Sequence, residues 1–473
     1  MRYALPFIMT LLGPMLSGCA SYKPVPIVPA DNARALEGRS LHDERLQRFV
    51  RLALADGGRP RAGAAWGLPA LTFAAIYYHP DLDIAHARLQ AAEAGIKTAA
   101  QIPNPSLGFE DLHYNPGPGT WVTAPIINFV IETFGKREAR TAEARHLADA
   151  ARWDLATAGW QVRGHVRTGM LALWAARHRL ALTRRRLALQ DQLVALLQRR
   201  FDAGQASALD VSRERINRAQ ITFTLRDLER AEAEARVQLA GAIGIPAHAL
   251  DGADLSLAAF DRSPRLPAEI GTGALRRRAL THRTDVQASL QDYEAAQSAL
   301  QLAIANQYPN ITLSPGYIYD AGINGFLMLP AADLPIFNQN QGPIAQALAR
   351  RQEAASTFTA LQAQVIAALD QAAAAYRATI RSVATGDALL ADAEHRARQI
   401  EQSFRAGDAD RPTLVTAELE AAATALSRFD AVVQQRQALG ALEDALQQPF
   451  YDPGQWPAVP AANPRLPAAS GAS

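Results

Sequence analysis

The chain contains one cysteine, Cys19, and its surroundings predict that the thiol is modified with lipid. A short leader begins with the basic Arg2, continues as an apolar stretch from Tyr3 to Met15, and ends in Leu16-Ser17-Gly18. Small residues directly before the cysteine are typical of a cleaved secretory signal. We expect a peptidase to remove residues 1–18, after which a diacylglycerol is added to the thiol and a third acyl chain to the freed amine. Two or more acyl chains anchor a protein stably in a membrane.

The other residue types exclude several classes of function. One cysteine excludes an intrachain disulfide framework and a cysteine-based zinc site. The ten histidines are scattered, and we interpret His79 and His113 as packing or surface residues. We find no nucleophile–base–oxyanion set and no Gly-rich phosphate loop. A net charge of +2 with 49% apolar residues indicates no nucleic-acid partner. We therefore expect no catalytic residue, no metal site and no cofactor apart from the N-terminal lipid.

Two long stretches carry the same apolar repeat of seven residues, and they stand 203 positions apart. Each ends in the same stop signal, Phe201-Asp202-Ala203-Gly204 and Phe404-Arg405-Ala406-Gly407. A heptad pattern is typical of long helices packed along a seam, and its duplication indicates two copies of one unit. The first seam comprises Val166, Leu173, Leu180, Leu187, Val194 and Phe201, and the second Leu369, Tyr376, Val383, Leu390, Ala397 and Phe404.

Upstream of each seam the pattern changes from helix to strand. Residues 104–134 hold two runs of about ten residues around a Gly/Pro turn at 115–119, and residues 310–337 repeat this around 320–325. Tilted strands of about 9–11 residues cross a bilayer, whereas no stretch reaches the roughly 18–20 apolar residues of a spanning helix. We therefore predict two transmembrane β-hairpins. Their alternating apolar faces comprise Trp121, Thr123, Ile127, Phe129 and Ile131, then Ile311, Leu313, Tyr317 and Tyr319.

These signals divide the chain into two repeats with flanking segments. We predict a signal peptide at 1–18, a lipid-anchored, Pro-rich extension at 19–70, repeat 1 at 71–245, a linker at 246–268, repeat 2 at 269–448 and a disordered tail at 449–473. In repeat 1 we predict a helix from Leu71 to Ile102, the hairpin 104–134, and long helices over 135–243 with a tip at 204–208. In repeat 2 we predict a helix from Ala274 to Asn306, the hairpin 310–337, and long helices over 342–446 with a tip at 407–412.

Four strands are too few to close a membrane barrel within one chain. Open edges in lipid leave unpaired N–H and C=O groups, each costing several kcal/mol. A helix pair about 100 Å long, at 1.5 Å per residue, likewise cannot bury its seam alone. Several copies side by side would share a β-barrel continuous with a helical tube, and this shape indicates a conduit. An ordinary coiled coil or antiparallel bundle accounts for the helices, but not for the hairpins.

The order of these motifs resembles the TolC family of outer-membrane efflux proteins over about residues 70–448. The resemblance implies a mainly α fold in which internally duplicated long-helix coiled-coil hairpins form a trimeric α-barrel, and four transmembrane β-strands per chain complete a 12-stranded barrel. It implies a non-catalytic homotrimer in the outer membrane with its body in the periplasm, where a periplasmic adaptor links it to an inner-membrane RND-type pump. The signatures are Asn104-Pro105-Ser106-Leu107, Tyr308-Pro309-Asn310-Ile311, Phe134-Gly135-Lys136-Arg137, Leu334-Pro335-Ile336-Phe337-Asn338, the two stop signals, and Cys19, which matches lipoprotein members.

The resemblance also suggests roles at the tips. In the family, aspartates just past the tips ring the aperture, and Asp210 is the match in repeat 1. Repeat 2 has Thr413-Leu414-Val415-Thr416 there, so Asp408, Asp410 and Glu418 are nearby substitutes and a second acidic ring stays open. A helix N-terminal charge, favoured by the macrodipole, is a compatible interpretation of Asp210. The residues expected to contact the adaptor are Phe201, Gly204, Phe404 and Gly407.

Residues 338–345, Asn-Gln-Asn-Gln-Gly-Pro-Ile-Ala, resemble the heavy-metal efflux conduits of the cobalt-zinc-cadmium type. We therefore expect the exit duct of a tripartite RND-type efflux system that exports heavy-metal cations. A drug efflux channel or a type I secretion channel is the alternative with a different cargo. A lipid-anchored structural coiled-coil protein of the cell envelope is the alternative from a different class.

Overall fold

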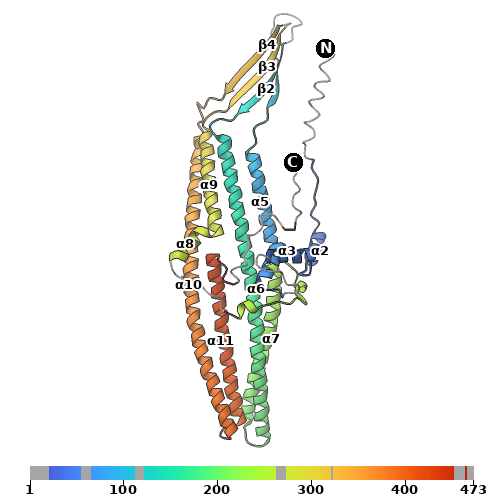
Figure 1. Cartoon of the computed structure of the whole chain (residues 1–473), viewed down its shortest axis with the longest axis vertical. Helices are drawn as coiled ribbons and strands as arrows, with labels where there is room; N and C mark the ends of the chain where they lie inside the picture. The colour runs from blue at the N-terminus through green and yellow to red at the C-terminus, as the bar shows by residue number, and fades with distance from the viewer. Residues whose placement is uncertain are drawn as a thin grey trace.

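The computed structural model of this 473-residue chain describes residues 21–54, 65–111, 122–262, 273–320, 323–451 and 464–465. Cys19, the signal peptide, the turn at 115–119, His113, Trp121 and most of the predicted tail lie outside these ranges. The molecule is long and narrow, with a small sheet at one end, two helical tips at the other, and short helices gathered at mid-length (Figure 1). This elongated shape follows from the lengths of the two longest helices.

Helices α6 (Lys136–Asp202) and α10 (Gln341–Ala406) run the length of the helical body. Their 67 and 66 residues correspond to about 100 Å each at 1.5 Å per residue. Near the sheet they pack with α5 (Pro80–Ala99) and α9 (Thr284–Ala305), and toward the tips with α7 (Ala208–Ile243) and α11 (Arg411–Leu446). The neighbours form one wall, in the order α5, α6, α9, α10 near the sheet and α7, α6, α11, α10 near the tips. None of the helices in the described ranges combines the length and apolarity needed to span a bilayer.

The sheet contains one hairpin from each repeat. The strands are β1 (Ser106–Asp111), β2 (Val122–Ile131), β3 (Ile311–Asp320) and β4 (Ile323–Ala332), antiparallel in the order β1-β2-β3-β4. The pairing of β2 with β3 joins the two repeats. β4 lies earlier than the predicted run 326–337, because Asp320 pairs with Ile323 and Ile311 with Ala332. The predicted mainly α fold, with duplicated helical hairpins and four strands, is confirmed.

Two predicted helices are each divided in two. The predicted helix from Leu71 to Ile102 is α4 (Leu68–Tyr78) followed by α5, because the residue before a proline avoids the helical conformation. His79 precedes Pro80, is extended, and caps α5 by accepting from the Asp81 N–H. The predicted helix from Ala274 is α8 (Gly273–His282) followed by α9, with an extended Arg283 between them.

The N-terminal extension contains helices α2 (Pro29–Glu37) and α3 (Glu44–Leu54), which were not predicted. Arg39, between them, donates from one guanidinium nitrogen to the carbonyls of Tyr78 and Gly244, both at 2.7 Å. Those carbonyls lie at the C-terminal ends of α4 and α7. One side chain therefore caps two helices and fastens the extension to the body.

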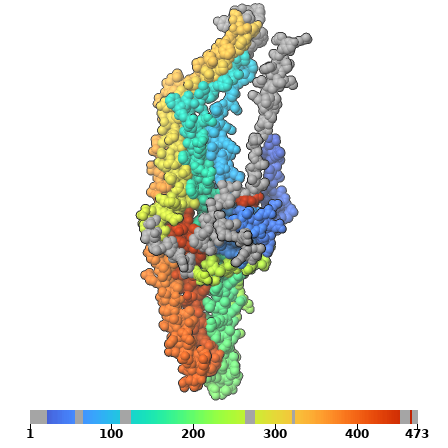
Figure 2. Space-filling view, in the orientation of Figure 1, coloured from blue at the N-terminus to red at the C-terminus, as the bar shows by residue number. Residues whose placement is uncertain are grey.

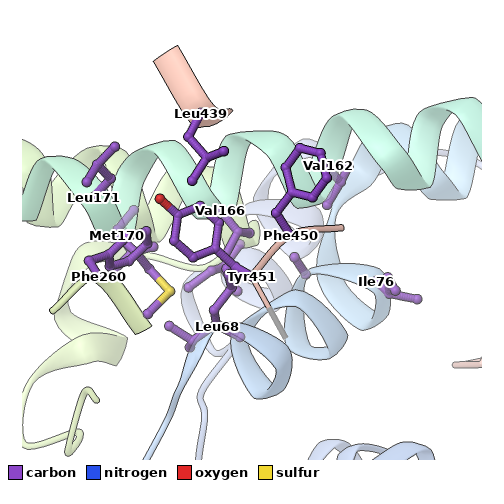
Figure 3. Close-up of a cluster of buried hydrophobic side chains, with 14 of the residues drawn as sticks. Leu68, Ile76, Val162, Val166, Met170, Leu171, Phe260, Leu439, Phe450 and Tyr451 are labelled. Atoms are coloured by element: carbon purple, nitrogen blue, oxygen red, sulfur yellow. The ribbon is translucent and has the colours of Figure 1, made fainter. Parts of the chain in front are cut away.

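The core lies at mid-length, where the wall is thickest. Figure 3 shows α4 side chains such as Leu68 packed toward Val166 and Met170 of α6. The short 3-10 helices η1 (Ala247–Leu250) and η2 (Ala258–Phe260) contribute to the same core. Phe450 and Tyr451 also belong to it and are 5% and 3% exposed. The predicted start of a disordered tail at 449 is therefore wrong by at least three residues, because these aromatic rings are packed inside.

A buried ion cluster fixes α11 and the following segment to α6. Arg163 and Arg167 both pair with Glu443, whose side chain is fully buried, and Arg167 also pairs with Asp444 at 2.7 Å. Burial raises the pKa of Glu443, and the two guanidiniums oppose that shift. The Phe450 N–H donates to Glu443 at 3.1 Å, so the cluster also holds the chain after α11.

Glu443→Gln should destabilise the fold, because it leaves two buried guanidiniums with one partly exposed carboxylate. Removing one partner of a buried ion pair costs about 3–5 kcal/mol. We expect a loss of that size in chemical denaturation followed by tryptophan fluorescence. Glu420→Gln, at an exposed position of the same helix, should change stability by less than about 0.5 kcal/mol. Equal effects of the two substitutions would contradict the assigned role of the cluster.

Candidate functional site

Both helical hairpins turn on a left-handed glycine at the end opposite the sheet. Gly204 has φ 72° and Gly407 has φ 90°, a conformation in which glycine is not strained. Their N–H groups donate to the carbonyls of Phe201 at 2.9 Å and Phe404 at 3.1 Å, which closes each helix as predicted. The turns place these four residues, predicted as adaptor contacts, at the lower end of the molecule (Figure 1).

The return helices begin on different acidic caps. In repeat 1, the Asp210 N–H donates to Ser207 Oγ at 3.1 Å and the Ser207 N–H donates to Asp210 Oδ2 at 3.3 Å, a capping box. In repeat 2, Asp410 itself is the N-cap and accepts from the Thr413 N–H at 2.9 Å. Hydrogen bonds from Ser207 hold the pKa of Asp210 below its ordinary value. Hydrogen bonds from Thr413, and then Arg200, lower the pKa of Asp410 to about 2.

Asp410 also connects the two hairpins. Arg200 near the end of α6 donates to Asp410 Oδ2 at 2.8 Å. Next to it, the guanidinium of Arg411 lies over the ring of Phe404, 5.7 Å from its centroid. Arg200 and Asp410 are 38% and 42% exposed, and surface ion pairs of this kind contribute at most about 1 kcal/mol. The contact therefore holds the two tips in register without locking them.

The remaining candidate acids are not brought together. The Asp408 side chain is exposed in the α10–α11 turn and makes no hydrogen bond or ion pair with other described residues, while Glu418 lies further along α11. In the described ranges, no three His, Cys, Asp or Glu residues are close enough to hold a metal ion. Ser207 and Arg200 were not predicted from the sequence as tip residues. The Ser-x-x-Asp spacing signals a capping box, whereas the pairing of Arg200 with Asp410 has no local signal.

At the other end, the sheet register collects apolar side chains on one face. Leu107 opposes Ile127, and Phe129 opposes Leu313. The same face continues to the last strand, where Phe326, 83% exposed, pairs with β3. Exposed apolar side chains in register across four strands suit a lipid environment. The predicted alternation is found on this face at Ile127, Phe129, Ile131, Ile311, Leu313, Tyr317 and Tyr319.

The opposite face of the sheet carries a polar ladder among small and apolar residues, since Ile126, Leu327 and Leu329 lie on the same face as Gly316. Asn128 donates to Ser106 Oγ at 3.2 Å, and Ser314 donates to Asn128 Oδ1 at 2.6 Å, which forms a polar ladder across three strands. Beside it, a Cβ on Gly316 would lie 2.6 Å from Ile126 Cγ2, so that position admits no side chain without displacement. The sheet therefore has one face of exposed apolar side chains and one face that carries the polar ladder.

The wall has two open edges that are not alike. β1 and β4 are the outer strands, α5 and α7 continue the β1 edge, and α10 continues the β4 edge. The far faces of these helices carry exposed apolar side chains, which on α7 follow heptad spacing. An exposed apolar stripe of this kind marks an interaction surface. Its residues are Leu209, Ile216, Phe223 and Val237 on α7, with Leu348, Ile380 and Leu389 on α10.

Asp410→Ala should loosen the first turn of α11, because the cap accepts the Thr413 N–H. Losing an N-cap costs about 1 kcal/mol, so amide exchange at Thr413 should accelerate roughly fivefold. Asp408→Ala should leave that exchange rate unchanged. Because the folded-state pKa of Asp410 is lowered to about 2, the cap contribution is present above pH 4 and is lost as the pH falls toward 2. Loss of the cap at pH 5 would contradict this assignment.

The profile of the outer membrane efflux protein family matches residues 74–245. The chain carries an outer membrane efflux domain. This match confirms the family resemblance that the motifs predicted. Residues 74–245 comprise α5, the first hairpin, α6 and α7, so the efflux domain contains the first tip and its capping box.

Two curated relatives share part of this chain. The cobalt-zinc-cadmium resistance protein CzcC of Cupriavidus metallidurans is 27% identical over 282 residues, 59% of this chain. The pyoverdine export outer membrane protein OpmQ of Pseudomonas aeruginosa is 30% identical over 327 residues, 66% of this chain. The chain spans 65% of the length of each of these relatives.

The fold is shared with solved structures. The outer membrane protein VceC of Vibrio cholerae superimposes with a TM-score of 0.65 at 20% identity, covering 80% of this chain and 95% of VceC. Long helical hairpins with a small sheet at one end are therefore the common architecture of these proteins.

Proposed function

We propose that three copies of this chain form the outer-membrane exit duct of a tripartite efflux system. The observation that carries the proposal is the wall with two open edges. Along the outer sides of β1 and β4, backbone N–H and C=O groups have no neighbouring strand among the described residues, and each unpaired group would cost several kcal/mol in lipid. Pairing β1 of one copy with β4 of the next would satisfy them. Three copies would then supply twelve strands, with the apolar face toward lipid and the Ser106–Asn128–Ser314 ladder toward the lumen.

The helical wall would continue the same cylinder below the membrane. The exposed stripe on α7 would meet the α10 edge of the neighbouring copy, so both would be covered. Helices of about 100 Å suit a duct that reaches across the periplasm. In this arrangement the tips with Phe201, Gly204, Phe404 and Gly407 face a periplasmic adaptor, which connects to an inner-membrane RND-type pump.

Asp210 is the residue that we assign to the aperture. Its carboxylate is exposed and charged, and three copies would place three such groups around the opening. Asp408, Asp410 and Glu418 would play smaller parts, because Asp410 is already paired with Arg200. A ring of fixed negative charge favours passage of cations.

Heavy-metal cations are the cargo that we favour. Similarity to the resistance protein CzcC supports this assignment, together with the motif at 338–345. Export of a small organic molecule is the second candidate, since OpmQ, named for pyoverdine export, is more similar in sequence at 30% identity. Selection between cargoes would rest with the pump, and the duct would be passive and non-catalytic.

The duct hypothesis predicts a trimer in detergent that conducts ions in planar bilayers. Light scattering should give three chains per particle, and removal of residues 320–325 should abolish conductance because it disrupts the β3–β4 turn. Asp210→Ala should weaken block by multivalent cations at low salt, while Asp202→Ala, on the other side of the same turn, serves as the matched control. A monomer without conductance would refute the duct, whereas equal block in both variants would only remove Asp210 from the aperture.

The proposed metal cargo can be tested by measuring growth in the presence of metal. A strain that lacks its metal-efflux ducts should regain growth in zinc or cadmium when this chain is expressed with a matched pump and adaptor. Rescue of siderophore release without rescue of metal tolerance would favour the second candidate.

We also propose that Cys19 carries the N-terminal lipid. Mass spectrometry of the N-terminal peptide from membranes should show three acyl chains on a chain that begins at Cys19. Cys19→Ser should give an uncleaved, unlipidated precursor. An unmodified thiol in the membrane-bound wild-type chain would contradict the proposal.

A further inference from the structure

Where the sheet meets the helices, the two repeats are fastened together inside the chain. The ring of Phe134, just after β2, stacks on Tyr308, just before β3, with centroids 3.9 Å apart. Thr133 donates to the Pro309 carbonyl at 2.6 Å, and Lys136 Nζ donates to the Tyr308 carbonyl and to Asn310 Oδ1, both at 2.6 Å. We call residues 132–135 the downstream joint of repeat 1 and residues 306–310 the upstream joint of repeat 2.

The duplication supplies a second example of each joint. Ile102-Pro103-Asn104 stands three residues beyond the end of α5, as Tyr308-Pro309-Asn310 stands three residues beyond the end of α9. Residues 333–340 connect β4 to α10, as 132–135 connect β2 to α6. These second joints lie at opposite edges of the wall, one beside β1 and the other beside β4. They cannot meet within one chain.

Both second joints expose apolar side chains. Phe337 is 96% exposed and Ile102 is 65% exposed, although their repeat-related counterparts stack on each other. Leu334 and Ile336 beside Phe337 are also exposed. These three large apolar side chains, within four positions of one connection, are therefore not packed into the fold of a single chain.

We propose that the downstream joint of repeat 2 docks on the upstream joint of repeat 1 in a neighbouring copy, with Phe337 covering Ile102. The inference rests on the ring proposed above, because a ring brings β4 of one copy next to β1 of another. These two joints would then meet between copies in the same way as joints 132–135 and 306–310 meet within the chain, where β2 pairs with β3. The occupant of the exposed surface at 334–337 is therefore a second copy of this chain.

The two junctions differ in chemistry in a consistent way. The position of Lys136, first in α6, is occupied by Gln341, first in α10, and the position of Tyr308 is occupied by Ile102. At the junction between copies, the charged lysine is thus replaced by a neutral glutamine and the aromatic tyrosine by an aliphatic isoleucine. The connection 333–340 also has eight residues where 132–135 has four, which gives Phe337 more reach.

A cysteine pair tests this contact directly. The full chain with Ile102→Cys and Phe337→Cys, purified in detergent and mildly oxidised, should give dimer and trimer bands in a non-reducing gel that collapse on reduction. We expect at least half of the chains in these bands. Each single variant should remain monomeric in the gel, which also controls for Cys19, the one native cysteine. The pair Ile102→Cys with Leu389→Cys, an exposed position far down α10, should likewise give no ladder.

The outcomes separate this inference from the duct itself. Trimers by light scattering without a ladder would overturn the joint contact and leave the duct standing. Absence of both trimers and ladder would overturn both. A ladder from Phe337→Cys alone, or quenching of a Phe337→Trp variant by brominated lipids in intact trimers, would show that Phe337 faces another surface and would overturn the inference.

Discussion

Unpaired backbone groups along β1 and β4 constrain everything else in this structure. A strand edge in water invites aggregation, and a strand edge in lipid costs several kcal/mol per group. Duplication shows how such an edge can be paired, because within the chain β2 of one repeat already pairs with β3 of the other. Repeating that relation between copies needs no new type of contact. The helices follow the strands in the same order, so a sheet that closes also sets the neighbours of α5, α7 and α10.

A thin wall has little interior, and this explains where stability is concentrated. Along most of α10 the side chains are exposed or half-buried, because one layer of helices covers only part of each surface. At mid-length the extension, α4, the 3-10 helices and the segment after α11 add a second layer, visible as the broad middle in Figure 2. The buried charges of Arg163, Arg167 and Glu443 and the double cap by Arg39 lie in this layer. The chain is thus held firmly at its centre, while the sheet and the tips would depend on neighbouring copies in the proposed duct.

Local signals were enough to predict the elements that repeat. The absence of proline between Gly135 and Pro246, with glycine at the turn, defined α6 and α7, and alternation of apolar residues defined the strands. Pro80 is a local signal for the division between α4 and α5, whereas the apolar pattern continues across it and favours one helix. Contacts between distant positions were not predictable: Arg167 with Glu443 and Arg200 with Asp410 depend on how the repeats pack. Phe450 and Tyr451, just after α11, were predicted to lie in the tail because the composition around them resembles that of the residues that follow.

Divergence between the repeats would limit the symmetry of the proposed ring of copies. Repeat 1 turns on a Ser207–Asp210 capping box with a free acidic face, whereas repeat 2 turns on Asp410, whose charge is already shared with Arg200. The joints differ similarly: the pair inside the chain includes the charged Lys136, whereas the two outer joints expose the apolar Ile102 and Phe337. Six hairpins of two kinds can alternate around a ring only with threefold symmetry. An acidic ring built on Asp210 would then contain three carboxylates separated by repeat 2 tips in which Asp410 is paired with Arg200, which spaces the charges and keeps their mutual repulsion low.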